Sequence, residues 1–573
     1  MKIVFLVGRD SSSTRQSIET VCRLPGVEPV AILLDTEIIG LKRRLKNLSR
    51  NIQKNGWSYP AIRFIQTIRI ALENVVENAV VPRKDALQVL REAFPERSFS
   101  LEDLAHKYGM AVHGVGNLNG DQAIRVMRES NSDLGIVLGT RILKSTTFSS
   151  PRLGCINLHK GKVPEYRGMP PGFWELYDGA SSAGITIHFV DKGLDTGDIV
   201  ASGSIPILNF DTPDTLLEKL NEEGDRQLAL AVSLIRDGKV QAKPQEKSAH
   251  KPRTRPTSKD VESLRLKLPH WKNESDLSTS FRFLYLLGVY YSGIYSLVRR
   301  WNLRKPSRAA IFLHHRVNDY SKDVLTVDLE TFAAQLLAIA KYYPFTSTRN
   351  IVDSVKLKRP IKATSVAIHF DDCYRDILTN GAPLLNALSV PACAFINSGF
   401  VGTHRPYPHD LDKYPFDYEK LSAAELRQWI EFGFDLGAHT VNHVDLGKML
   451  GETAEHEIID CGKELEKIVS KPVDLFSYPF GRPENISVGS REIVKTSGYV
   501  ALFSAYGGIV DSRTDPYDIP RMGASFDTSP LYCILQIEQL SPSQVLSSFR
   551  DLLATLKRHA LTRGAVPKQD RAG

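Results

Sequence analysis

The stretch CINLHKGKVPEYRG, residues 155–168, and the stretch GLDTGDI, residues 193–199, decide how the first part of the chain folds. CINL predicts a short strand, and because strand side chains alternate, Asn157 and His159 lie on the same face. Asp195 comes after the next predicted strand, ITIHF. We therefore predict that Asn157, His159 and Asp195 converge on one site.

Working outward, apolar runs separated by helical segments predict an α/β fold in both halves of the chain. Strands are predicted in the first half at 3–7, 30–34, 134–138, 155–158, 185–189 and 197–207, with a helix at 212–236. They are predicted in the second half at 365–370, 392–397, 434–438, 474–478 and 499–504. Repeated β/α units of this second kind form a parallel sheet or barrel.

A chain of 573 residues is too long for one core. We expect a first domain at 1–242 with a helical insertion at about 41–102, a linker and an apolar, basic helix at 243–304, a second domain at 305–556 and a disordered tail at 557–573. Six widely spaced cysteines without a CxxC pair indicate free thiols, which places the protein in the cytoplasm. The N-terminal MKIVFLVGRD predicts a buried strand and not a signal peptide.

Two basic segments leave membrane contact open. The segment 41–54, LKRRLKNLSRNIQK, predicts an amphipathic helix, and Phe281–Val298 is an aromatic, apolar stretch followed by several arginines. We expect both to pack on their own domains, with attachment to a membrane interface as the alternative. The balance of 73 Lys and Arg against 65 Asp and Glu is typical of a solvated surface, with anionic substrates or a membrane as the alternative.

The first site has the groups that acyl transfer to an amine requires. Such a transfer needs a polarised carbonyl oxygen, a path for the proton and the exclusion of water. Asn157 can donate its amide N–H to the developing oxyanion, and His159 can donate a hydrogen bond or carry the proton. Asp195 can orient His159 or a bridging water and favour the charged imidazole. The pattern predicts transfer of a one-carbon acyl group.

With VPEYRG at 163–168 and GITIH at 184–188, this region resembles the formyltransferase fold of methionyl-tRNA, glycinamide ribonucleotide and sugar N-formyltransferases, over about residues 1–260. The resemblance implies a Rossmann-like sheet, 10-formyltetrahydrofolate as cofactor, and catalysis by Asn157, His159 and Asp195. The residues in the place of the family's folate-contacting Ser-Leu-Leu-Pro loop are Gly161, Lys162, Val163 and Pro164, of which only the proline matches.

A second signature, HFDDC at 369–373 with His439-x-x-x-His443, indicates metal-assisted amide hydrolysis. That reaction needs a cation with an open position and a base for its water. On a helical turn, the spacing of His439 and His443 would put both imidazoles on one side. Of the adjacent Asp371 and Asp372, one can bind the metal while the other takes the proton of the bound water.

The order HFDD, GAHTVNH, FSYPFG resembles the polysaccharide deacetylase (NodB-homology) family, over about residues 305–550. Similar stretches are FLHHRV at 312–317 and DPYDIPR at 515–521. The resemblance implies a distorted (β/α) barrel, with the loop 478–480 lining the site. The implied roles are Asp371 as base and Asp372, His439 and His443 as ligands of a divalent metal. We expect zinc, while nickel, cobalt or manganese also suit two histidines and an aspartate.

Three positions depart from the deacetylase pattern. Cys373 replaces the glycine of FDDG, and Ser477 stands where the family often has an arginine. No LxLxxH segment supplies the usual general acid, for which His315 or a water is the substitute.

Together the signatures predict a bifunctional carbohydrate-modifying enzyme. One domain would formylate an amino sugar that is nucleotide- or lipid-linked, and the other would remove an N-acyl group. The alternative is that one domain is catalytic and the other a binding module. No nucleic-acid partner is expected, because no basic, aromatic-interleaved pattern appears, and this disfavours tRNA formylation. The oligomeric state stays open.

Overall fold

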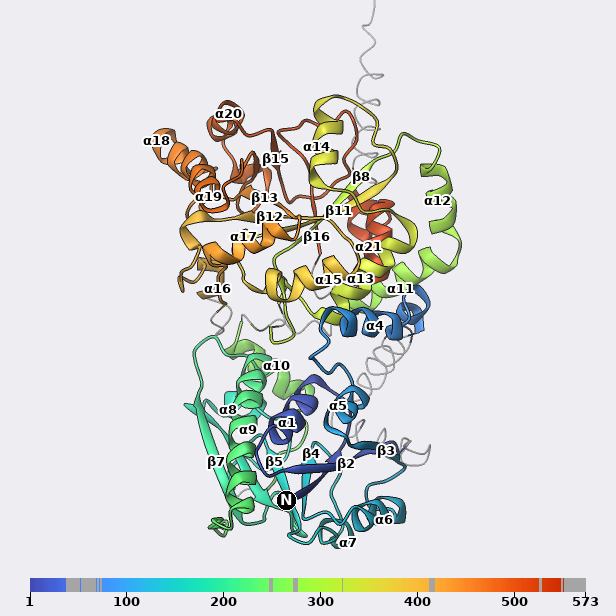
Figure 1. Cartoon of the computed structure of the whole chain (residues 1–573), viewed down its shortest axis with the longest axis vertical. Helices are drawn as coiled ribbons and strands as arrows, with labels where there is room; N and C mark the ends of the chain where they lie inside the picture. Colours follow the sequence, from blue (N-terminus) through green and yellow to red (C-terminus); the bar gives the residue numbers. More distant parts are fainter. Residues whose placement is uncertain are drawn as a thin grey trace, which may run out of the picture.

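The computed structural model describes residues 1–37, 52, 69, 72, 75–246, 251–269, 271, 277–321, 323–411, 418–524, 528–547 and 550. Two α/β domains lie one above the other along the long axis of the molecule, each around its own seven-stranded sheet (Figure 1). The basic helix predicted at 41–54, apart from Ile52, and the tail predicted at 557–573 lie outside the described residues. Among the described helices, none combines the length and the apolar character that crossing a membrane requires.

The first sheet has the strand order β3-β2-β1-β4-β5-β6-β7. Its strands are β1 (Lys2–Val7), β2 (Glu28–Asp35), β3 (Ala111–Val115), β4 (Leu134–Leu138), β5 (Cys155–His159), β6 (Ser182–Phe189) and β7 (Ile199–Pro206). Strands β1 to β5 pair in parallel, whereas β6 and β7 pair antiparallel. This topology confirms the predicted Rossmann-like domain. The predictions missed β3, because its sequence AVHGV contains no apolar run.

Helices cover both faces of the first sheet. They are α1 (Ser12–Cys22), α5 (Leu101–Tyr108), α6 (Asp121–Glu129), α7 (Ser145–Phe148), α8 (Phe173–Asp178), α9 (Pro213–Arg236) and α10 (Ser258–Lys267). The side chains of β1 alternate between two buried clusters, with Ile3 and Phe5 on one face and Val4 and Leu6 on the other. A continuous apolar strand is typical of a parallel sheet that is covered on both sides.

The second sheet is all parallel, in the order β15-β14-β13-β12-β11-β8-β16. Its strands are β8 (Ala309–His314), β11 (Ser365–Asp371), β12 (Ala392–Ile396), β13 (Asp435–Ala438), β14 (Leu475–Ser477), β15 (Ala501–Phe503) and β16 (Met522–Gly523). Ile519 pairs with Phe503 of β15, and three residues later Met522 pairs with Phe312 of β8. The segment 519–523 therefore brings the two edges of the sheet together, which confirms the predicted distorted barrel.

The elements around this barrel are mostly short. The helices are α11 (Leu277–Tyr291), α12 (Ile294–Asn302), α13 (Leu329–Tyr342), α14 (Thr348–Lys356), α15 (Ala382–Ala387), α16 (Pro408–Leu411), α17 (Ala423–Glu431), α18 (Gly451–Glu455), α19 (Cys461–Val469), α20 (Val488–Thr496) and α21 (Pro530–Ile537). Single turns lie at η1 (Ile377–Gly381), η2 (Ser398–Phe400), η3 (His456–Asp460) and η4 (Pro483–Asn485), and a small parallel pair is formed by β9 (Arg316–Val317) and β10 (Thr326–Val327).

The described end of the insertion packs on the second domain, although its sequence lies in the first. Helix α4 (Arg83–Ala93) lies against α13 (Figure 1). Val80, Leu90 and Phe94 are buried in the hydrophobic cluster of the second domain. Arg83 also pairs with Glu330 of α13, with an Nε–Oε1 distance of 2.5 Å. The segment 75–99 therefore completes the core of the second domain.

The Lys- and Pro-rich segment after residue 243 returns to the first domain. Arg253 pairs in parallel with Gly168, donating its N–H to the Arg167 carbonyl at 2.7 Å and accepting from Met169 at 3.2 Å. Its guanidinium lies 4.9 Å from the ring centre of Trp174 on α8. Residues 251–267, expected in the linker, thus lie against the 166–174 region that borders the first predicted site.

Candidate active sites

The three residues predicted for the first site do converge. Asn157 and His159 lie on β5, and Asp195 lies in the loop between β6 and β7. The Nδ1 atom of His159 is 3.6 Å from Oδ2 of Asp195, and Asn157 donates its amide to Oδ1 at 3.4 Å. The Gly168 N–H donates to Oδ2 at 3.1 Å. Asp195 adopts the left-handed conformation, with φ 53°, which turns its carboxylate toward β5.

A second imidazole, His188, belongs to this site and was absent from the predicted catalytic set. His188 on β6 is the register partner of Asn157 on β5. Its Nδ1–H donates to the Phe189 carbonyl at 2.8 Å, so Nε2 is free to accept from the Asn157 amide at 3.3 Å. Nε2 also lies 3.7 Å from Asp195. The alternation of ITIHF, which puts His188 on one face with Thr186, was the available signal.

The electrostatics of the first site differ from the expectation that Asp195 favours a charged His159. Burial lowers the pKa of His159, and this outweighs the opposing effect of the Asp195 charge. Burial alone would raise the pKa of Asp195, but the two neighbouring imidazoles of His188 and His159 and the hydrogen bond from the Gly168 N–H hold that pKa below its usual value. The resting site therefore contains an ionised Asp195 beside a neutral His159, whose Nε2 lies 2.9 Å from the Tyr166 carbonyl.

The expected folate loop borders His159. A Cβ on Gly161 would lie 2.4 Å from the Tyr166 oxygen and 2.6 Å from Nε2 of His159, so only glycine fits there. Lys162 is exposed and pairs with Glu165 at 3.1 Å, and Val163 is buried before a cis bond to Pro164. The Asn157 amide can donate a hydrogen bond to a formyl oxygen, and the loop 161–164 lies next to this site.

In the second domain the predicted residues also converge, but not on a helix. Asp371 is the last residue of β11 and Asp372 follows it, and His439 follows β13. The helical turn expected for His439 and His443 is wrong, because these residues lie in a loop in which Thr440 has φ 64° and His443 φ 55°. The loop is fixed from outside: the Val441 N–H donates to the Glu457 carbonyl, and the Asn397 amide donates to the Thr440 carbonyl.

The predicted metal ligands form a compact, buried group. One potential ligand atom each from Asp372, His439 and His443 lies within 4.8 Å of the others. Nε2 of His443 is 3.3 Å, and Nε2 of His439 3.8 Å, from Oδ1 of Asp372. His439 donates its Nδ1–H to the Ser477 carbonyl at 2.7 Å, which leaves Nε2 as its ligand atom.

These ligands fit a cation on a further observation. Both oxygens of Asp372 and Nδ1 of His443 are buried without a hydrogen-bond partner. A buried, unsatisfied carboxylate is costly. Burial and the neighbouring Asp371 charge raise the pKa of Asp372 well above its usual value. A divalent cation among the three ligands would reverse both effects, and the donor set suits zinc and its neighbours in the transition series.

Arg521 supplies the guanidinium that the YPFG motif lacks. It comes from DPYDIPR, is fully buried, and donates from Nη1 and Nη2 to the two oxygens of Asp371 at 2.7 Å each. Nη2 also donates to the Ser477 hydroxyl at 2.6 Å. Burial raises the pKa of Asp371, but the Arg521 charge more than offsets this and holds that pKa well below its usual value. The stretch DPYDIPR is part of the resemblance to the deacetylase family, but the sequence alone predicts no role for its arginine.

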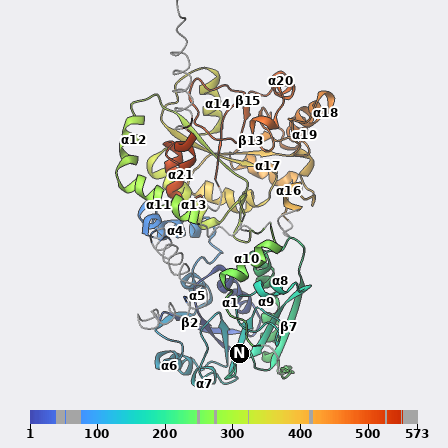
Figure 2. The ribbon, with the colours of Figure 1, turned by 180° about the vertical axis from the view of Figure 1, so that it is seen from behind.

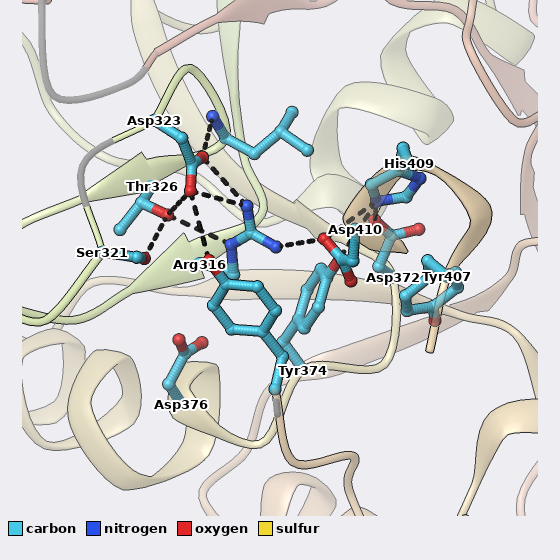
Figure 3. A network of polar contacts seen from close by, with 12 residues as sticks. Arg316, Ser321, Asp323, Thr326, Asp372, Tyr374, Asp376, Tyr407, His409 and Asp410 are labelled. Atoms are coloured by element: carbon cyan, nitrogen blue, oxygen red, sulfur yellow. Dashed lines mark hydrogen bonds and ion pairs between the residues drawn. The ribbon is translucent and has the colours of Figure 1, made fainter. Parts of the chain in front are cut away.

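His409 is a further imidazole near the predicted metal site. It lies on α16, with Nε2 3.6 Å from Oδ2 of Asp372 and 2.9 Å from the Tyr374 hydroxyl (Figure 3). The Tyr374 hydroxyl donates to Asp410 at 2.8 Å, and Arg316 donates to the other oxygen of Asp410 at 2.7 Å. A buried polar network therefore runs from Arg316 on β9 to the metal-ligand group.

The remaining departures are explained by burial. Cys373 is fully buried in the core of the second domain, and burial raises the pKa of its thiol to about 12. Burial lowers the pKa of His315, the expected substitute acid, to about 3, which keeps its imidazole neutral. Phe480 of the predicted lining loop packs edge-on against His443, with ring centres 5.0 Å apart.

Known families match both halves of the chain. Residues 64–232 match the formyl transferase family, and residues 358–502 match the polysaccharide deacetylase family. The two matches do not overlap, so the two halves of the chain are similar to two different families, both of which consist of enzymes. In family terms, the chain joins a formyl transferase domain to a polysaccharide deacetylase domain.

Individual relatives cover only part of the molecule. The methionyl-tRNA formyltransferase of Bacteroides fragilis is 36% identical over 142 residues, which are 25% of this chain and 44% of that protein. The chain thus spans less than half the length of this curated relative. Among solved structures, the Streptococcus pyogenes deacetylase PplD in complex with acetate has a TM-score of 0.36 at 20% identity, covering 41% of this chain and 99% of PplD. Phosphoribosylglycinamide formyltransferase from Bacillus halodurans has a TM-score of 0.27 at 16% identity, covering 41% of this chain and 95% of that one.

Proposed function

We propose that the chain is a bifunctional enzyme of amino-sugar modification. The first domain transfers a formyl group from 10-formyltetrahydrofolate to the amine of a sugar. The second removes an N-acyl group from a sugar with a divalent metal. The observation that carries the proposal is that one chain assembles both Asn157, His159 and Asp195 and the ligand group of Asp372, His439 and His443.

In the formyl transfer, the sugar amine attacks the formyl carbon and the bond to the folate nitrogen breaks. The Asn157 amide stabilises the oxyanion that forms on the formyl oxygen. His159 is neutral at rest, and with Nε2 directed at the Tyr166 carbonyl, its Nδ1 receives the amine proton. Asp195 faces Nδ1 and stabilises the imidazolium before the proton passes to the leaving nitrogen.

In the deacylation, Asp372, His439 and His443 would hold the metal. When bound, the metal would polarise the amide carbonyl and activate a water. Asp371 is ionised and oriented by Arg521, so its carboxylate receives the proton of that water as the water oxygen bonds to the acyl carbon. When the bond between the acyl carbon and the sugar nitrogen breaks, this proton passes to the leaving amine, and the acyl group is released as a carboxylic acid. His439 is oriented through its Nδ1–H, which donates to the Ser477 carbonyl.

Two orders of reaction are compatible with one chain. Deacylation followed by formylation would replace one acyl group with another, whereas formylation followed by deformylation would use the formyl group transiently.

The absent LxLxxH motif favours the alternative in which only the first domain turns over. Because the curated relatives are named methionyl-tRNA formyltransferases, methionyl-tRNA is a necessary comparison acceptor.

Two single-site variants test the proposal. Asp195→Asn and Asp372→Ala are incubated with 10-formyltetrahydrofolate and an amino sugar, its N-acetyl and N-formyl forms, or methionyl-tRNA. We expect Asp195→Asn to lose formyl transfer and keep acyl release, and Asp372→Ala to show the reverse. Loss of both activities in each variant would refute two independent sites. Turnover of methionyl-tRNA alone would refute the sugar acceptor.

A further inference from the structure

Helix α12 lies at the outer edge of the second domain (Figures 1 and 2). Its exposed apolar side chains are called the ridge below: Ile294, Leu297 and Trp301, with Leu303 at the C-terminal end of the helix. The chain breaks at Gly293, with φ 84°, so the predicted apolar stretch forms α11 and α12 and not one helix. Positions 294, 297 and 301 share one face of α12. The exposed fractions on this face are 45% for Ile294, 70% for Leu297 and 61% for Trp301, and Leu303, which caps the C-terminal end of the helix away from this face, is 63% exposed.

The opposite face of α12 fixes the helix to the domain. The Tyr295 hydroxyl lies 3.2 Å from that of Tyr343, and Arg299 donates to the Tyr342 carbonyl at 3.3 Å. Asn302 donates to Glu538 at 2.5 Å. These contacts hold the helix without help from the ridge, so burial inside the fold does not account for its apolar side chains.

Positive charge borders the ridge. Arg300, Arg304 and Lys305 are exposed, and none has an ion-pair partner among the residues that the structure describes. Arg308, by contrast, is neutralised by Glu538 at 2.7 Å. The ridge therefore combines large apolar side chains, including a tryptophan, with cations that are not neutralised.

We propose that this ridge is a docking surface for an anionic lipid bilayer. Leu297, Trp301 and Leu303 would enter the boundary between headgroups and acyl chains, while Arg300 and Lys305 contact lipid phosphates. A second copy of the chain fits less well, because a symmetric contact would bring the same three cations of each copy together. With nine residues, α12 lies on the surface and does not cross it.

The test measures binding to vesicles of phosphatidylcholine, with and without phosphatidylglycerol, by co-sedimentation of the full chain. We expect binding to the acidic vesicles. Leu297→Ser/Trp301→Ser/Leu303→Ser should weaken it at least tenfold, because apolar area drives interfacial insertion. Arg300→Glu/Arg304→Glu/Lys305→Glu should weaken it roughly fivefold or more per residue, since one charge near an acidic surface contributes about 1 kcal/mol.

Matched controls come from exposed residues elsewhere. Leu266→Ser/Leu450→Ser/Val488→Ser changes apolar side chains that are 77–88% exposed, and Arg125→Glu/Arg128→Glu reverses charges on α6. Both should bind as the wild type does, and unchanged melting curves show that all variants fold. No binding by the wild type, or equal binding by the ridge variant, would overturn the proposal. So would a dimer in sedimentation velocity that only the ridge variants abolish, without vesicle binding.

Discussion

At the scale of single residues, Arg521 shows how a missing motif residue is replaced from a distant part of the chain. The sequence has Ser477 where the family often has an arginine, yet the barrel brings Arg521 to the same carboxylate. A comparison of local motifs could not find the contact between Arg521 and Asp371, because these residues meet only when the segment 519–523 joins the edges of the sheet.

Replacing Arg521 should disable the second site. Arg521→Ala leaves Asp371 charged and buried without its partner, which costs about 3–5 kcal/mol in comparable cases. Arg521→Lys keeps the charge but not the two parallel hydrogen bonds, so it should restore only part of the loss. The measurements are acyl release and thermal unfolding. Full acyl release by Arg521→Ala would contradict the role given to this ion pair.

The neutral state of His159 predicts a pH dependence of stability. Its folded pKa lies below the ordinary 6.5, so protons bind the unfolded chain more tightly. The contribution of His159 to the free energy of unfolding is therefore complete above pH 6.5, and it is lost as pH falls from there through the pKa of the folded state. Each unit by which the folded and unfolded pKa values differ corresponds to about 1.4 kcal/mol. His159→Gln should remove this loss in urea unfolding above and below pH 6.5, and parallel pH slopes for both proteins would contradict it.

At the scale of elements, the short helix α16 and the strand β9 contribute side chains that surround the predicted metal ligands. Arg316 is fully buried, with its guanidinium 3.9 Å from the ring centre of Tyr418, and it pairs with Asp323 and Asp410. His409 and Asp410 belong to none of the predicted motifs, so the spacing of residues in the sequence could not identify them. Their proximity to Asp372 arises from the packing of Tyr374 and Tyr407 (Figure 3).

The hydroxyl of Tyr374 should affect metal affinity. Tyr374→Phe removes the group between His409 and Asp410 without changing the ring that packs on Arg316. His409 lies 3.6 Å from the predicted ligand Asp372, so loss of this hydrogen bond should weaken metal binding, by less than the about 10–100-fold typical of a group bonded directly to a ligand. Competition of the metal-free protein with a chromophoric chelator for zinc measures this. The control is Tyr506→Phe, which removes a surface hydrogen bond to Asp518. Equal zinc affinity in both variants would contradict the prediction.

At the scale of the whole molecule, the two signatures predicted the order of the domains and both fold classes. The apolar strands and the spacing of Asn157, His159 and Asp195 carried that information. The loop geometry of His439 and His443 was not predictable, because it depends on Glu457 and Asn397 from other elements. The contact of 75–99 with the second domain was not predictable for the same reason. An amphipathic pattern indicates that one face of a helix is buried, but not which domain that face packs against.

Shortening Phe94 should destabilise the second domain, not the first. Its ring is buried in the cluster of the second domain, and truncation of a buried phenylalanine costs about 3–5 kcal/mol. We expect Phe94→Ala to lower the temperature at which acyl release is lost while formyl transfer persists. Phe432→Ala, at a partly exposed phenylalanine of the second domain, is the control. A shift confined to formyl transfer would contradict the packing assignment.

The position of 75–99 also has a genetic consequence. Two full-length chains, one defective at Asp195 and the other at Asp372, should complement each other in one cell, because each still folds both domains. Two half-chains divided near residue 277 should not, because the C-terminal half lacks the segment that completes its core. The two reactions would therefore be inherited together, since neither half of the coding sequence specifies a complete second domain.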